Sequence, residues 1–139
     1  MDYLVMVVDD DALFRKVTAD LLRRHNYKVV TASSWMDFTK SYYKASPKPD
    51  LVIIDINLGG VMSGDKIIRA LRKEEKITGG QDKKTKLVLI SSCEEEEIKR
   101  KAEEVSADGY ILKESLNIAG GASFLNKIRT LLLSENKVN

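Results

Sequence analysis

The chain has 139 residues, 43% of them hydrophobic, and its 23 Lys and Arg residues almost balance its 21 Asp and Glu residues. This length supports one well-buried core, so we expect a single domain over residues 1–139 with no output domain. The net charge of +2 argues against general electrostatic binding to nucleic acid or membranes, and the single cysteine excludes an intrachain disulfide or a cysteine-based zinc site. The chain contains no run of about 18 apolar residues, the length needed to span a membrane. We expect a cytoplasmic protein.

Five short apolar runs are spread along the chain, at residues 4–8, 28–32, 51–56, 87–90 and 110–112. Continuous apolar runs of this length are typical of strands that are covered on both faces. Pro47 and Pro49, residues 59–60 and the polar stretch 78–86 mark loops, and the glycine pair at 79–80 is expected to be the most flexible part.

Stretches with the spacing of amphipathic helices separate these runs. The first predicted helix carries Leu13, Val17 and Leu21 on one face and ends near Asn26. The other four helices are predicted to begin at Ser34, at Ser63 or Gly64, near Glu94, and in the stretch that carries Phe124.

Two of these helices allow finer predictions. In the second helix, Asp37 lies three residues after Ser34, as in a capping box. In the third helix, the spacing places Ile67 and Leu71 inward and Arg72 in water.

The strict alternation of strands and helices predicts the fold class. It implies parallel strands joined by right-handed crossovers, with helices on both faces of the sheet. We therefore expect an α/β fold, a doubly wound sheet of five parallel strands in the flavodoxin-like order 2-1-3-4-5, with five helices.

Polar residues stand where four of the predicted strands end. Asp9 and Asp10 follow the first strand, Asp55 ends the third, Ser91 follows the fourth, and Lys113 follows the fifth. In a doubly wound sheet the functional crevice lies beyond the carboxyl ends of the strands. Three carboxylates, a hydroxyl and an ammonium are thus predicted to converge at one edge.

Clustered carboxylates need a counter-cation, because two unit charges about 4 Å apart repel by roughly 4 kcal/mol at an effective dielectric constant of 20. Magnesium suits these oxygen ligands, and manganese is a possible substitute. We expect Asp10 to bind the ion directly, Asp9 to bind it through water, and Asp55 to serve as both ligand and nucleophile.

Four segments that end predicted strands resemble the signature segments of bacterial response-regulator receiver domains. They are residues 7–11 (VVDDD), 50–57 (DLVIIDIN), 89–92 (LISS) and 109–113 (GYILK). The resemblance covers residues 3 to about 133, and its strength lies in the occurrence of all four segments in order.

The resemblance implies that Asp55 accepts a phosphoryl group from a phosphohistidine on a sensor histidine kinase or histidine phosphotransfer protein. It also implies supporting roles for six matching residues. Asp9, Asp10 and the backbone carbonyl of Asn57 would bind magnesium, Lys113 and Ser91 would contact phosphoryl oxygens, and Tyr110 would swing inward as the Ser91 hydroxyl moves. Phosphoryl transfer needs little more than an in-line nucleophile and positive charge around the phosphoryl oxygens.

The resemblance further implies a signalling switch that catalyses only its own phosphorylation and dephosphorylation, and in that sense is not an enzyme. Phosphorylation would remodel the surface of the fourth helix, fifth strand and fifth helix for a protein effector that the sequence does not identify. We expect a monomer or a phosphorylation-linked dimer that binds neither nucleic acid nor membrane directly.

Two features depart from the family pattern. Glu114 follows Lys113 where proline is commoner, so the usual cis peptide bond is not expected there. The segment 57–64 is about one residue longer than usual and lacks a proline near Gly59, so we expect a flexible loop beside Asp55.

Simpler roles remain open for single residues. Asp10 and Asp11 could form only a helix N-cap, Ser91 or its neighbour Ser92 could cap the fourth helix, and Tyr110 could be an aromatic at the edge of the core.

Three other functions are open for the whole chain. A flavin-binding module would need a Ser/Thr/Gly-rich turn after the first strand, where this chain has three aspartates. A phosphatase with an aspartate nucleophile would need a second acid where Asn57 stands. A degenerate receiver would act only as a protein-interaction scaffold.

Overall fold

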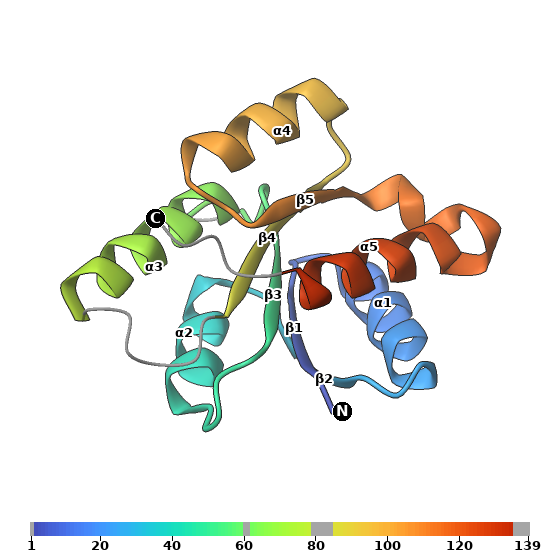
Figure 1. Ribbon diagram of the computed structural model, residues 1–139, viewed down its shortest axis with the longest axis horizontal. Helices are drawn as coiled ribbons and strands as arrows, with labels where there is room; N and C mark the ends of the chain where they lie inside the picture. Colours follow the sequence, from blue (N-terminus) through green and yellow to red (C-terminus); the bar gives the residue numbers. More distant parts are fainter. Residues whose placement is uncertain (1, 60–61, 79–84, 135–139) are drawn as a thin grey trace.

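The computed structural model of the protein describes residues 2–59, 62–78 and 85–134. Its centre is a parallel sheet made of β1 (Leu4–Val8), β2 (Lys28–Ala32), β3 (Leu51–Asp55), β4 (Lys86–Ser91) and β5 (Gly109–Leu112). The strands lie in the order β2-β1-β3-β4-β5, and every neighbouring pair is parallel (Figure 1). The predicted fold class and strand order are confirmed.

Helices cover both faces of the sheet (Figure 1). One face packs against α1 (Ala12–Arg24) and α5 (Ala122–Leu133), and the other against α2 (Trp35–Lys44), α3 (Gly64–Thr78) and α4 (Glu95–Glu104). Two 3-10 turns, η1 (Lys113–Asn117) and η2 (Ala119–Gly121), connect β5 to α5. Within the described parts of the chain, no helix combines the length and apolarity needed to cross a bilayer.

The central strands β1, β3 and β4 carry long apolar runs because each contributes to two cores. In β3, Val52 and Ile54 pack under α2, α3 and α4, whereas Leu51 and Ile53 pack under α1 and α5. Successive side chains of a strand point to opposite faces of the sheet, so burial of both faces requires an unbroken apolar run.

The inner face of α1 differs from the prediction. Leu21 is buried, but Leu13 is 70% exposed and Val17 43% exposed. The inner stripe instead runs through Phe14, Thr18 and Leu21, whose i, i+4, i+7 spacing is equally helical. The sequence did not indicate this stripe because Thr18 is polar, yet Thr18 is fully buried.

The N-terminus of α2 is capped nearly as predicted. The Ser34 hydroxyl accepts a hydrogen bond from the Asp37 amide at 3.2 Å. The Asp37 carboxylate, however, accepts from the amide of Ser33 at 3.1 Å rather than from that of Ser34, so the reciprocal bond of the capping box is shifted by one residue.

The predicted loop over residues 78–86 is shorter than expected at both ends. Thr78 ends α3, and Lys86 opens β4. Lys86 is buried, and its Nζ donates to the Ser134 carbonyl at 3.0 Å, just beyond α5. Residues 79–84 lie outside the described residues, so the flexibility expected of the glycine pair at 79–80 stays a prediction.

Arg72, predicted to lie in water, instead joins α3 to the turn before β5, and its side chain is only 17% exposed. Its guanidinium donates to the Asp108 carboxylate at 2.7 Å and to the Ser106 carbonyl at 2.9 Å. The same Asp108 oxygen accepts from the Leu87 amide at 2.7 Å, so Arg72 also secures the start of β4. A rigid guanidinium with several donors suits such a junction.

Replacing Arg72 by methionine should lower the free energy of unfolding by about 2 kcal/mol, because hydrogen bonds to charged groups contribute about 1.5–3 kcal/mol. Urea denaturation measures this change. The exposed neighbour Lys73 is the matched control, since Lys73→Met removes the same charge from the same helix and should change stability by less than about 0.5 kcal/mol. Equal effects of the two substitutions would contradict a junction at Arg72.

Candidate functional site

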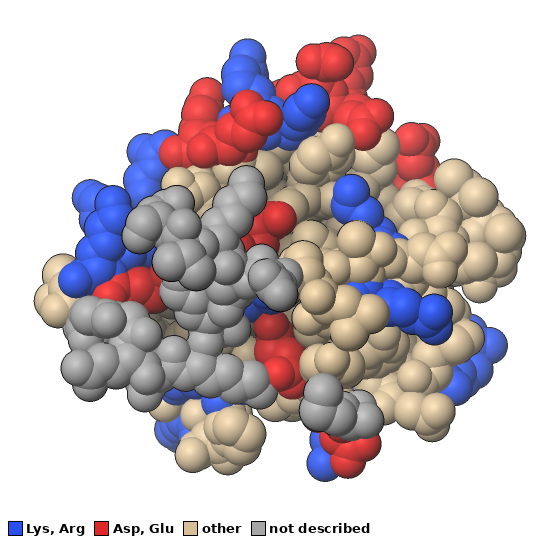
Figure 2. Space-filling model, viewed as in Figure 1, with Lys and Arg blue, Asp and Glu red and all other residues tan. Residues whose placement is uncertain are grey.

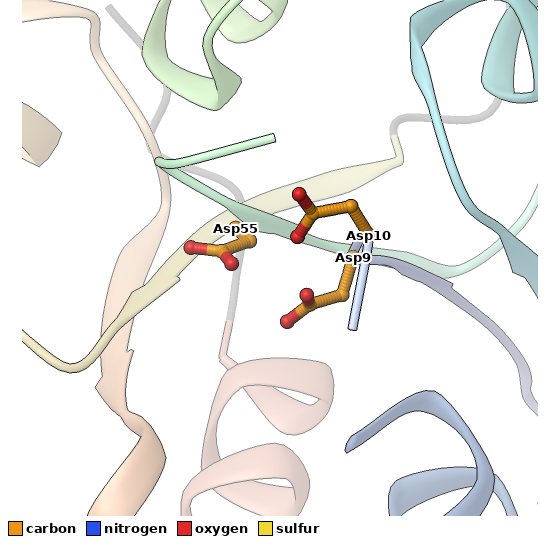
Figure 3. Close-up of side chains that lie close together, drawn as sticks. All are labelled: Asp9, Asp10 and Asp55. Atoms are coloured by element: carbon orange, nitrogen blue, oxygen red, sulfur yellow. The ribbon is translucent and has the colours of Figure 1, made fainter. Parts of the chain in front are cut away.

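Three carboxylates meet at the carboxyl edge of the sheet, as predicted. Figure 3 shows Asp9, Asp10 and Asp55 close together, with Asp9 and Asp10 extending toward Asp55, and each offers an oxygen that lies within 4.8 Å of those of the other two. The register of the central strands explains the meeting: Val8 pairs with Ile54, so the residues that follow them leave adjacent strands side by side.

Lys113 reaches the same point from the end of β5. Its Nζ donates to Asp55 Oδ2 at 2.9 Å and forms an ion pair with Asp9 Oδ2 at 2.7 Å. The Lys113 side chain is 18% exposed, whereas both carboxylates are buried. One ammonium therefore lies between two buried anions.

Opposing influences act on the two central groups. Burial raises the pKa of Asp55, hydrogen bonds from Lys113 and the Asn57 amide lower it, and the nearby Asp9 charge raises it; the net result is a raised pKa. For Lys113, burial lowers the pKa, but pairing with Asp9 and Asp55 outweighs burial and leaves the pKa raised. Thus Lys113 stays charged, while the ionised form of Asp55 is destabilised by its surroundings.

This raised pKa predicts how stability depends on pH. The folded state binds the Asp55 proton more tightly than the unfolded state does, so the unfolding free energy of metal-free protein should fall as pH rises from the ordinary aspartate range through the raised pKa. Asp55→Asn cannot ionise and should be more stable than the wild type at neutral pH. Urea unfolding across a pH series in a chelator tests this, and a less stable Asp55→Asn at neutral pH would contradict it.

Asp9 is held by the backbone around it. Its Oδ1 accepts from the Asp11 amide at 2.9 Å, and its carbonyl accepts from Arg15 Nη1 at 2.7 Å. Asp11 is the N-cap of α1, and its carboxylate accepts from the amides of Leu13 and Phe14. Asp11 therefore fills the capping role, and Asp10, which is exposed, takes no part in it.

The donor set suits a hard divalent cation. All three residues offer carboxylate oxygens, and Lys113 is the cation that Asp9 Oδ2 meets, at 2.7 Å. Magnesium typically binds one or two carboxylates and leaves its other positions to water and phosphate oxygens. Because Asp10 is exposed, water and phosphate could reach an ion bound there. The Asn57 amide donates to Asp55 Oδ1 at 3.1 Å, and the ligand role of the Asn57 carbonyl stays a prediction.

Ser91 ends β4 and is buried. Its hydroxyl accepts from the Cys93 amide at 3.1 Å and does not cap α4, whose N-cap residue is Glu94. Ser91 and Lys113 line one pocket of about 450 Å³, together with Phe14 and Leu116. Ser91 thus shares a pocket with Lys113, and the predicted contact of its hydroxyl with a phosphoryl group stays a prediction.

Tyr110 lies in an outward arrangement. Its hydroxyl donates to the Glu95 carboxylate at 2.8 Å, in the first turn of α4, and Lys127 Nζ lies 5.1 Å from the ring centroid. The hydrogen bond to Glu95 raises the pKa of Tyr110. The inward position predicted for the switch is not the one in this structure.

The two expected departures have different outcomes. The cis peptide bond among the described residues is Ser46-Pro47, so the bond between Lys113 and Glu114 is trans, as predicted. In the loop beside Asp55, Gly60 and Val61 lie outside the described residues, and the flexibility expected of this loop stays a prediction.

Two residues of the site, Gly64 and Phe14, were not predicted from the sequence. Gly64 opens α3 directly against Asp55: a Cβ at Gly64 would lie 2.2 Å from the Asp55 carbonyl oxygen. Phe14 places its ring centroid 4.6 Å from Lys113 Nζ. A glycine at the start of a helix was a visible signal for Gly64; no signal in the sequence linked Phe14 to Lys113.

A family model described as response regulator receiver domain matches residues 5–118. The chain belongs to this family. A curated relative, the chemotaxis protein CheY of Treponema pallidum, is 33% identical to this receiver domain over 115 residues, which are 80% of this chain and 72% of the relative. Membership and this relative support a phosphorylation-dependent signalling switch, in agreement with the acidic cluster.

Solved receiver structures share the fold. Chemotaxis protein CheY4 of Vibrio cholerae has a TM-score of 0.76 at 22% identity and covers 94% of this chain and 99% of its own. The BeF3-activated N-terminal receiver domain of RstA from Klebsiella pneumoniae has a TM-score of 0.72 at 27% identity, with the same coverage of both chains.

Proposed function

We propose that this receiver domain is a switch in which Asp55 accepts a phosphoryl group from a phosphohistidine on a sensor histidine kinase or histidine phosphotransfer protein. The observation that carries the proposal is the buried Asp55 carboxylate, which is bonded to Lys113 and grouped with Asp9 and Asp10. The likeness to a CheY relative and to a BeF3-activated receiver domain supports it.

In the proposed transfer, an Asp55 carboxylate oxygen forms a bond to phosphorus while the phosphorus–nitrogen bond of the donor breaks. The imidazole leaves with the electron pair and takes up a proton from its surroundings. Lys113 orients the Asp55 oxygen beforehand and would neutralise a phosphoryl oxygen afterwards, with Ser91 contacting another. Attack of water on the aspartyl phosphate releases inorganic phosphate, regenerates the carboxylate and resets the switch.

Asp9, Asp10, Asp55 and the Asn57 carbonyl would hold magnesium, or manganese in its place. When bound, the ion supplies positive charge to the phosphoryl oxygens. It would also relieve the repulsion among the carboxylates, of which Lys113 alone can neutralise only part.

We further propose that phosphorylation acts on the surface formed by α4, β5 and α5. Ser91 and Tyr110 would couple Asp55 to that surface, and loss of the bond between Tyr110 and Glu95 would release the ring. In this proposal the domain works in the cytoplasm, as a monomer or phosphorylation-linked dimer, through a protein effector rather than direct nucleic-acid binding. It catalyses only its own phosphorylation and dephosphorylation.

Incubation with acetyl phosphate, followed by intact-mass measurement, tests the proposal. The wild type should gain one phosphoryl group with magnesium and none in a chelator, and Asp55→Asn should gain none. The control is Asp20→Asn, because Asp20 is an exposed carboxylate on α1 and its replacement should leave labelling unchanged. An unlabelled wild type would instead favour a degenerate receiver that serves as an interaction scaffold.

A further inference from the structure

The Lys113 ammonium has a third neighbour besides its two carboxylates. The Phe14 ring lies with its centroid 4.6 Å from Nζ, within the range in which an aromatic ring attracts a cation. Asp9 and Asp55 are anions and Phe14 is neutral, so the three contacts respond differently when charges at the site change.

The Phe14 ring is held in place by its own helix. Phe14 lies in the first turn of α1, and its amide donates to the Asp11 carboxylate at 3.2 Å. The ring is partly buried and packs against the core under α1 and α5. Phe14 therefore meets Lys113 from a fixed position on α1.

The carboxylate contacts cannot hold Lys113 throughout phosphorylation. Asp55 changes from a carboxylate into an acyl phosphate, and a cation bound by Asp9 would weaken its attraction to the ammonium. Until a phosphoryl oxygen takes their place, a flexible, strongly hydrated lysine that loses these partners would move toward water. The ring face keeps its attraction because neither event alters it.

We propose that Phe14 is a positioning residue that keeps the Lys113 ammonium beside the phosphoacceptor while Asp9 and Asp55 exchange partners. The inference rests on the proposed function. A purely structural role for Phe14 makes a different prediction, since leucine fills much of the same volume but lacks the aromatic face. Tyrosine retains both the volume and the aromatic face of phenylalanine.

A first measurement does not depend on phosphorylation. The ring current of Phe14 should shift the ε-methylene NMR signals of Lys113 in the unphosphorylated wild type. Phe14→Leu should remove the shift and Phe14→Tyr should keep it. Signals of Lys113 that are unchanged in Phe14→Leu would overturn the proposed contact.

A second measurement follows labelling by acetyl phosphate with magnesium. Phe14→Leu should lower the labelling rate by about two- to thirtyfold, Phe14→Tyr should restore it, and Phe14→Leu should have no further effect on Lys113→Met. Asp20→Asn is again the control, since Asp20 is an exposed residue of the same helix and does not line the pocket. Equal rates for wild type and Phe14→Leu would overturn this inference alone, whereas an unlabelled wild type would overturn the proposed function and this inference with it.

Discussion

Replacing Gly64 by alanine is expected to destabilise the protein by about 3 kcal/mol or more, at the upper end of the cost of overpacking. The added Cβ would lie 2.2 Å from the Asp55 carbonyl oxygen and 2.9 Å from Ile54 Cγ2. The Gly64 amide also donates to the Ile56 carbonyl at 2.9 Å, so α3 cannot withdraw without losing that bond. Backbone atoms on both sides must move, and Asp55 moves with them.

Urea denaturation measures the loss, and Gly120→Ala provides the control. Gly120 has a φ of +64° but nothing within 4 Å of its missing Cβ, so alanine there costs only about 1 kcal/mol of backbone strain. Labelling of Gly64→Ala by acetyl phosphate should fall even where the variant is still folded. If Gly64→Ala cost no more than Gly120→Ala, the close packing of α3 on Asp55 would be refuted.

Replacing Lys113 by methionine should produce the second large effect. The substitution keeps most of the side-chain volume but leaves Asp9 and Asp55 buried beside each other without their cation. Breaking a buried ion pair from one side costs about 3–5 kcal/mol, and magnesium should restore part of this loss. Loss of a preorganised charge at the phosphoryl group should slow labelling about a hundredfold or more.

Unfolding in a chelator and in magnesium, together with labelling kinetics, measures both effects. Lys113→Arg keeps the positive charge and should retain most of the stability, although its planar group cannot reproduce the position of the ammonium. If Lys113→Met were as stable as the wild type in a chelator and were labelled at the same rate, the proposed roles of Lys113 in stability and phosphorylation would be disproved.

The sequence predicted the sheet and its polar edge well because both depend on local patterns. Apolar runs identify strands buried on both faces, and parallel strands bring their ends together whatever the details of packing. Asp9, Asp10, Asp55 and Lys113 therefore meet as predicted.

Contacts between distant elements could not be predicted in the same way. On α1 two stripes had helical spacing, and the stripe that is buried contains the polar Thr18. Arg72 looked like a solvated charge because its partner Asp108 lies 36 residues away. The contact of Phe14 with Lys113 likewise depends on how α1 packs beside η1, which no local pattern encodes.

The most direct test of the account is the location of the phosphoryl group. The protein would be treated with acetyl phosphate and magnesium, and borohydride would then reduce any aspartyl phosphate to homoserine, which peptide mass spectrometry locates. Conversion is predicted at Asp55, and none at Asp9 or Asp10. Conversion at either of those residues, or a labelled protein with Asp55 intact, would contradict the assignment of Asp55 as the phosphoacceptor.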